Sequence, residues 1–178
     1  MKVYFLTEGT RTSPASRIRV YNYLDRLAGN DDFQAETVSF TGEACCRALV
    51  SGKAPCLFLR GAGQLRQMLI WAGLRSAAAR SDAVFIQRVL PPAGITARLV
   101  ALKTRLVYDF DDAVYLGGTE REMRFREMMR AASRVIAVSS AAAREAVRLG
   151  AEESRVAVIP RSKTNSCTGP RPGCGSRS

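Results

Sequence analysis

The sequence predicts an α/β domain in which helices cover both faces of a doubly wound, mostly parallel sheet. Segments typical of strands alternate with segments of helical periodicity from residue 2 to residue 159. The predicted strands are continuous apolar runs, as expected for strands that are buried on both faces. Right-handed crossovers between such strands give a single Rossmann-like domain.

The strands are predicted from runs of β-branched, aromatic and aliphatic residues at 2–7, 34–40, 56–59, 83–88, 105–110, 134–138 and 155–159. Helical spacing of apolar residues predicts helices at 14–28, 63–80, 91–103, 120–132 and 140–149. Residues 42–55 fit neither pattern.

Local signals mark several helix ends. Ser13 before Pro14 is a typical helix start, and Ser139 is a typical N-cap of the last helix. Gly29 and Gly150 are typical helix ends. In the helix at 63–80 we expect the core-facing side chains to be Leu65, Met68, Leu69 and Ala72.

The pattern stops after Pro160. Residues 161–178 contain no Leu, Ile, Val, Met or aromatic residue, so they cannot pack a core. We therefore divide the chain into a domain at 1–160 and a disordered basic tail at 161–178. The tail is interpreted either as a natural solvated segment or as a frame-shifted end.

The charge balance favours anionic partners. The chain has 27 basic and 16 acidic residues, a net charge of +11, and such a surface attracts nucleic acid, phosphorylated substrates or an acidic membrane leaflet. One basic region spans residues 43–80, where six Lys and Arg residues accompany a single acid, Glu43. This region predicts either a helix that docks on acidic lipid or a core-facing helix with solvated arginines.

Several site types are excluded by composition. The chain has no histidine, which excludes a Ser-His-Asp triad, a Cys-His pair and histidine-based metal sites. Its five cysteines lack C-x-x-C spacing, so a disulfide framework or zinc site is not expected and a reducing compartment fits better. With no apolar run of signal-peptide or membrane-span length, the predicted location is cytoplasmic, with peripheral contact at the inner membrane face as an option.

The most informative stretch is residues 106–113, Leu-Val-Tyr-Asp-Phe-Asp-Asp-Ala. It is a short apolar strand that runs into Asp109, Asp111 and Asp112. In open α/β sheets ligands bind at the carboxyl ends of strands, and carboxylates so close together need a compensating ligand, cation or backbone donor. The alternative is a solvated loop whose acids cap the next helix.

A second candidate site is the loop from Glu8 to Ser13, between the first strand and the first helix. Backbone amides at a helix N-terminus favour anions, and Arg11, Arg17 and Arg19 add positive charge. The loop therefore predicts a phosphate or nucleotide site, against the alternative of an ordinary strand–helix connection.

Four segments together resemble one enzyme family. Residues 2–6 (Lys-Val-Tyr-Phe-Leu) and 13–19 (Ser-Pro-Ala-Ser-Arg-Ile-Arg) resemble the amino-terminal half of glycosyltransferases of family four, which have two Rossmann domains (GT-B). Residues 107–113 resemble an Asp-hydrophobe-Asp-Asp-Ala segment of one subgroup. Residues 132–139 and 156–160 resemble the family's last strand–serine element and the proline that leads to its second domain.

The resemblance implies that a sugar is moved from a nucleotide-sugar donor to an acceptor, without a bound metal or other cofactor. In this family the amino-terminal domain mainly receives the acceptor. By resemblance, Asp111 and Asp112 are the candidate catalytic residues that line the cleft, and the candidate substrate-binding residues are Ser13, Arg17, Arg19 and Ser139. No general base is named, because the histidine that this half often contributes is absent.

In the family a second Rossmann domain follows the position of Pro160, whereas here the coreless tail begins. We therefore expect a truncated or frame-shifted product that lacks most donor contacts and has negligible transferase activity alone. Two alternatives are a basic module that binds acidic lipid or, less well supported by its few interleaved aromatics, nucleic acid, and a half-enzyme completed in trans by a separate donor domain.

Overall fold

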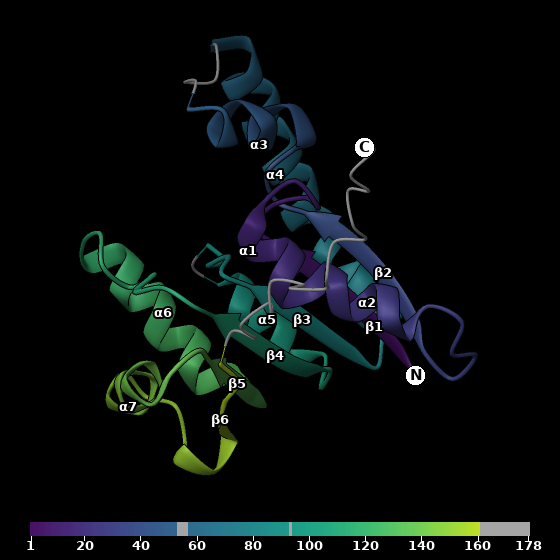
Figure 1. Cartoon of the computed structure of the whole chain (residues 1–178). Coiled ribbons are helices and arrows are strands. Elements are labelled where there is room, and N and C mark those ends of the chain that lie inside the picture. Colours follow the sequence, from purple (N-terminus) through teal and green to yellow (C-terminus); the bar gives the residue numbers. More distant parts are fainter. Residues whose placement is uncertain (53–56, 93, 161–178) are drawn as a thin grey trace, which may run out of the picture.

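The computed structural model describes residues 1–52, 57–92 and 94–160. In this part of the chain six strands form a single sheet (Figure 1): β1 (Lys2–Thr7), β2 (Gln34–Ser39), β3 (Ala83–Gln87), β4 (Arg105–Phe110), β5 (Arg134–Ala137) and β6 (Val156–Val158). Their order is β2-β1-β3-β4-β5-β6, and every neighbouring pair is parallel. The predicted fold class is confirmed.

The helices lie in the crossovers between these strands. They are α1 (Pro14–Ser16), which continues through a π-helical turn (Arg17–Tyr21) into α2 (Asn22–Leu27), then α3 (Glu43–Val50), α4 (Leu57–Ala79), α5 (Ile95–Ala101), α6 (Thr119–Ala131) and α7 (Ser140–Arg148). A 3₁₀ turn at Glu153–Arg155 precedes β6.

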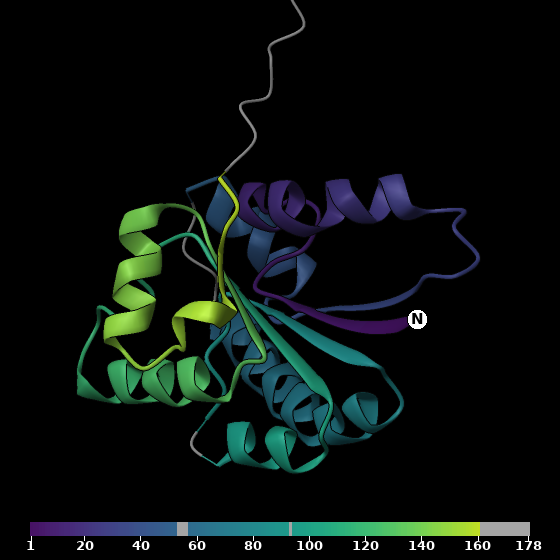
Figure 2. The same cartoon turned by 90° about the horizontal axis from the view of Figure 1, so that it is seen from below.

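The strand order places the helices on opposite faces of the sheet. The crossover from β1 to β2 runs one way along the sheet, and all later crossovers run the other way. Because each crossover is right-handed, the first one lies on one face and the later ones lie on the other. Figure 2 shows this arrangement, with α1 and α2 on one side of the strands and α4, α5 and α6 on the other.

Side chains alternate along β1 between two apolar cores. Tyr4 and Leu6 point into the larger core under α4 to α7, while Val3 and Phe5 pack with Val20 in a smaller core under α1 and α2. The parallel strands are thus covered by apolar contacts on both faces.

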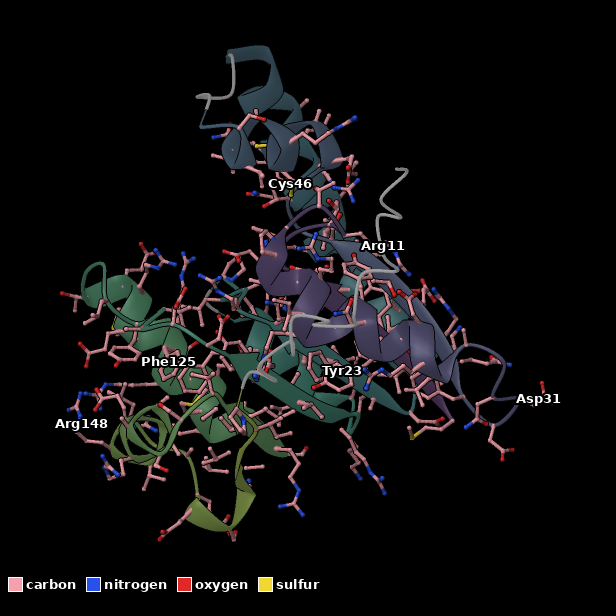
Figure 3. All side chains as sticks on the ribbon, viewed as in Figure 1. Arg11, Tyr23, Asp31, Cys46, Phe125 and Arg148 are labelled. Atoms are coloured by element: carbon pink, nitrogen blue, oxygen red, sulfur yellow. The ribbon has the colours of Figure 1, made fainter. Side chains whose placement is uncertain are left out.

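Phe125 of α6 is the aromatic centre of the larger core. Its side chain is fully buried, and its ring centroid lies 5.2 Å from those of Phe110 and Tyr115 and 6.0 Å from that of Tyr108. Figure 3 labels it on α6. These contacts fix α6 directly beneath β4, the strand that carries the acidic stretch.

The predicted core face of α4 is wrong. Leu65, Met68 and Leu69 are exposed by 61%, 68% and 65%, and Ala72 is also exposed. The buried side of α4 is instead formed by Ile70, Leu74, Ala77 and Ala78. The helix is apolar on two sides, and its second half lies on the sheet while Figure 1 shows its first half and α3 projecting beyond the strands.

Two further predictions concern the chain around α4 and after β6. The predicted strand at 56–59 is wrong from residue 57 onward, because α4 begins at Leu57; Cys56 lies outside the described residues, as does the predicted disordered tail at 161–178. Residues 42–55, which fitted neither pattern, contain α3. In the described ranges, none of the helices is both long and apolar enough to cross a membrane.

Candidate functional site

The candidate site lies at the carboxyl edge of the sheet, where the strand order reverses. Strand β1 has β2 on one side and β3 on the other, so the loops after β1 and β3 diverge at this point. A crevice at such a switch point is the usual ligand site of open α/β sheets. The loop after β4 reaches the same edge, because β4 is the next neighbour of β3.

Arg88, the first residue after β3, is the centre of this edge. Its guanidinium lies 3.2 Å from Glu8 Oε2, 3.2 Å from Asp111 Oδ1 and 2.7 Å from Asp112 Oδ2. Its backbone is in the left-handed region, with φ 61°, and its amide donates to the Asp109 carbonyl at 2.9 Å. One cation therefore joins the loops after β1, β3 and β4.

The three carboxylates of the acidic stretch do not emerge together, contrary to the prediction. The Asp111 side chain is fully buried against Arg88, whereas that of Asp112 is 55% exposed at the rim. Asp109 is the penultimate residue of β4 and is almost fully buried beneath the first helix. The repulsion expected among them is relieved by two arginines, Arg88 and Arg19.

A hydrogen-bond set built on Gln87 holds the loop after β1. The Gln87 side chain is fully buried, and its Oε1 accepts from the Ser16 hydroxyl at 2.9 Å and from the Glu8 amide at 3.2 Å. The Ser16 oxygen in turn accepts from the Gly9 amide at 3.0 Å. A side chain at residue 9 would place its Cβ 2.6 Å from that of Ser13, so only glycine fits this turn.

A cavity of 260 Å³ opens between this loop and α3. It is lined by Glu8, Gly9, Ser13, Thr41, Cys46, Leu49, Val50 and Arg88. Ser13 is the N-cap residue of α1, but its hydroxyl makes no capping hydrogen bond, so that hydroxyl is available to a ligand. Cys46 is buried on the side of α3 that faces the rest of the domain (Figure 3).

Arg19 is not directed into this cavity. Its guanidinium makes a two-pronged ion pair with Asp109, including a hydrogen bond from Nε to Oδ2 of 3.1 Å, and donates to the Ile159 carbonyl at 2.8 Å. Burial raises the pKa of the Asp109 carboxyl above its ordinary value, and Arg19 opposes that rise. The pair ties the first helix to β4 and to the chain after β6.

The other predicted site residues are found as follows. Arg17 lies exposed in the π-helical turn of the first helix. Ser139 caps α7, as predicted, with its oxygen accepting from the Ala142 amide at 3.2 Å. In the ranges that the structure covers, no three His, Cys, Asp or Glu side chains converge in a way that could hold a metal ion.

Sequence reasoning missed Gln87 and Arg88 as site residues, whereas Glu8 belongs to the loop that was predicted as a second candidate site. The available signal for Arg88 was its position directly after the apolar strand at 83–87, beside the strand that carries the acids. The interpretation of 83–88 as one strand concealed it, because a residue inside a strand is not expected to leave the sheet.

Comparisons with known proteins agree with this architecture. The family described as "Glycosyl transferase 4-like domain" matches residues 13–162. A search of curated proteins found no match.

Solved structures of HepE (Alr3699) from Anabaena share the fold. The structures in complex with UDP, and with UDP and glucose, each have a TM-score of 0.55 and 18% identity. The UDP-glucose complex has a TM-score of 0.53 and 19% identity. The match covers 90% of this chain but 44% of the HepE chains, so the chain spans less than half of their length. With most of its length matched by the family, the chain belongs to the glycosyl transferase 4-like domain family.

Proposed function

We propose that residues 1–160 are the acceptor-side half of a glycosyltransferase that moves a sugar from a nucleotide-sugar donor to an acceptor. The observation that carries the proposal is the 260 Å³ cavity at the switch point of the sheet, in a chain of this family. The HepE structures contain UDP and UDP-glucose, which supports a nucleotide sugar as the donor.

In this proposal Asp112 contacts the substrate and Asp111 acts through Arg88. The exposed Asp112 carboxylate can accept a hydrogen bond from a sugar hydroxyl or stabilise positive charge that develops at the transferred sugar. The buried Asp111 carboxylate holds the guanidinium of Arg88 in place by an ion pair. The Ser13 hydroxyl offers a second polar contact, while Arg17 and Ser139 stay predictions as substrate-binding residues at the rim.

We expect the chain alone to show negligible sugar transfer. Similar structures are more than twice as long as the matched region, so the groups that hold the donor would come from another domain or from a separate polypeptide that completes the enzyme in trans. Incubation of residues 1–178 with UDP-glucose and an acceptor, with mass detection of the product, tests this. Normal turnover would contradict the assignment as one half.

The acceptor site is tested by binding. Methyl glycosides titrated into labelled protein should shift the amide resonances of Glu8, Ser13 and Arg88 in a saturable way. We expect Asp112→Asn to weaken this binding about tenfold, because a hydrogen bond to a charged acceptor is lost. The matched control is Asp31→Asn, an exposed acid at the far side of the domain (Figure 3). Equal binding by the two variants would refute the proposed site.

A second proposal is that the exposed apolar side of α4 contacts an acidic membrane surface. Leu65, Met68 and Leu69 are exposed together, and residues 44–81 contain six Lys and Arg but no acid. An apolar helix side with basic neighbours is the form that interfacial binding takes. Contact with anionic lipid would place the protein at the inner face of the membrane.

Vesicle sedimentation tests this second proposal. Binding should require phosphatidylglycerol in phosphatidylcholine vesicles, fall with salt, and be lost when Leu65, Met68 and Leu69 are all changed to Gln. Met123→Gln, at an exposed apolar position of α6, is the matched control. Equal sedimentation with and without phosphatidylglycerol would reject contact with acidic lipid.

A further inference from the structure

We infer that the acceptor bound at the edge cavity is amphipathic: a single sugar ring attached to an apolar tail, with the ring beside Glu8 and Arg88 and the tail along Leu49 and Val50. The inference rests on the proposed function, and it adds the chemical class of the acceptor. It follows from the polarity of the cavity wall, from the size of the cavity and from the exposure of its mouth.

The wall of the cavity is divided into a polar and an apolar part. The loop after β1 and the end of β3 contribute the partly exposed Glu8 carboxylate, the Ser13 hydroxyl and the Arg88 guanidinium. These groups donate and accept hydrogen bonds, as a sugar ring with several hydroxyls requires. The opposite wall is α3, which contributes Leu49 and Val50 from its last turn.

The apolar side chains lie in water at the mouth of the cavity. Leu49 is 57% exposed and Val50 is 60% exposed, whereas Cys46, one turn earlier on the same helix, is buried. Single exposed apolar residues are ordinary on protein surfaces. Here two adjacent exposed apolar residues belong to the lining of a polar cavity, so a molecule that extends out of the cavity can lie on them.

The volume of the cavity limits what fits inside. At 260 Å³ it is smaller than the roughly 300–1,000 Å³ of pockets that enclose a drug-sized ligand. It therefore admits about one sugar ring, and the remainder of the acceptor lies outside, over Leu49 and Val50. An apolar remainder gains by removing these side chains from water, whereas a further sugar, with its surface of hydroxyls, gains less from covering them.

The experiment compares methyl and hexyl β-glycosides of glucose, galactose and N-acetylglucosamine, with 1-hexanol as the tail alone. Each is titrated into residues 1–178 below its micelle concentration, while the methyl resonances of Leu49 and Val50 and the amides of Glu8, Ser13 and Arg88 are followed. A fully buried methylene strengthens binding about fourfold. A tail that is half covered should give about twofold per carbon, so we expect the hexyl glycoside of the preferred sugar to bind roughly thirtyfold more tightly than its methyl glycoside.

Variants separate the tail contact from the ring contact. Changing Leu49 and Val50 together to Gln should reduce the advantage of the hexyl glycoside over the methyl glycoside to less than about fivefold. Both side chains are mostly exposed, so the variant should fold normally, as an unfolding curve will check. Met123→Gln, at an apolar position exposed by 54% on α6, should change nothing.

The outcomes distinguish this inference from the proposed function. If methyl and hexyl glycosides bind the ring site equally well, the acceptor class is wrong and the acceptor site stands. Hexanol binding as tightly as hexyl glycoside would show an apolar patch with no sugar site attached, and would also overturn the inference. If no glycoside shifts the amides of Glu8, Ser13 and Arg88, both proposals fail.

Discussion

Removing Arg19 should destabilise the domain by leaving Asp109 buried without its counter-ion. The side chains of Arg19 and Asp109 are 6% and 2% exposed, so neither charge is well hydrated in the folded protein. In the Arg19→Met variant the stem of residue 19 still packs, but the carboxylate loses its partner. Breaking a buried pair from one side costs about 3–5 kcal/mol, a large part of the roughly 5–15 kcal/mol by which such domains are stable.

The loss should depend on pH in a defined direction. Burial raises the pKa of Asp109 already in the presence of Arg19, and removing the arginine should raise it further. A carboxyl whose folded pKa lies above its unfolded value of about 3.9 gives stability that is complete below that value and is lost as pH rises through the folded pKa. The deficit of Arg19→Met relative to the wild type should therefore grow by up to about 1.4 kcal/mol per pH unit between the raised pKa of Asp109 in the wild type and its higher pKa in the variant.

Urea unfolding at pH 5 and pH 7 measures this effect. We expect a deficit of about 1–2 kcal/mol at pH 5 and about 3–5 kcal/mol at pH 7. Asp109→Asn in the Arg19→Met background should remove the extra pH dependence, because Asn does not ionise. Arg11→Met is the matched control, since Arg11 pairs with Asp25 in solvent, and it should leave the unfolding curve unchanged. A deficit below 1 kcal/mol, or one equal at both pH values, would refute the reasoning.

Four further substitutions test packing and local structure by the same unfolding measurement. Phe125→Ala should cost about 3–5 kcal/mol, because it empties a fully buried ring site; a loss under 2 would mean that the core repacks. Ser139→Ala should cost about 1 kcal/mol by removing the N-cap of α7, and an unchanged curve would show that water replaces it. Gly9→Ala should cost about 1–3 kcal/mol because the new Cβ would meet Ser13 at 2.6 Å. Gly61→Ala in α4, with open space around it, should instead stabilise by about 0.5–1 kcal/mol; similar effects at both glycines would argue against the close approach at residue 9.

The elements that sequence reasoning predicted well are those with local signals. The apolar runs of β1 and β4 coincide with the strands at Lys2–Thr7 and Arg105–Phe110. Ser139 is found as the cap of α7, because a hydroxyl before a helical repeat is a local signal. Parallel pairing followed from the alternation of strands and helices, which is again readable along the chain.

The orientation of α4 was not predictable in this way. Both sides of the helix carry apolar residues, with Leu65, Met68 and Leu69 on one and Ile70 and Leu74 on the other, so periodicity alone does not identify the buried side. The length of α4 explains why only one of these sides is buried. A helix of 23 residues is about 34 Å long, whereas a strand of six residues covers about 20 Å. Only part of α4 can lie on the sheet, and its second half does.

The edge of the sheet that carries the candidate site could be identified from the sequence, but the charge pairing at that edge could not. The carboxyl ends of β1 and β4 were predicted to meet ligands, and the cavity does lie at that edge. The pairs that neutralise the acids join residues far apart in the chain: Arg19 with Asp109, and Arg88 with Glu8 and Asp111. Which arginine reaches which acid depends on how the loops leave the sheet, and no local pattern encodes that.

The backbone of Arg88 indicates that this pairing is what the edge of the sheet is built to maintain. Lys103, the other described non-glycine residue with positive φ, follows α5, where a left-handed residue is an ordinary helix end. Arg88 instead follows a strand, where its φ of 61° costs on the order of 1–3 kcal/mol. A glycine would remove that strain but would also remove the ion pair between Arg88 and Asp111, and breaking a buried ion pair from one side costs about 3–5 kcal/mol. The strained arginine therefore has the lower energy only if the carboxylates at this edge must be kept. A substrate site at the edge would impose that requirement.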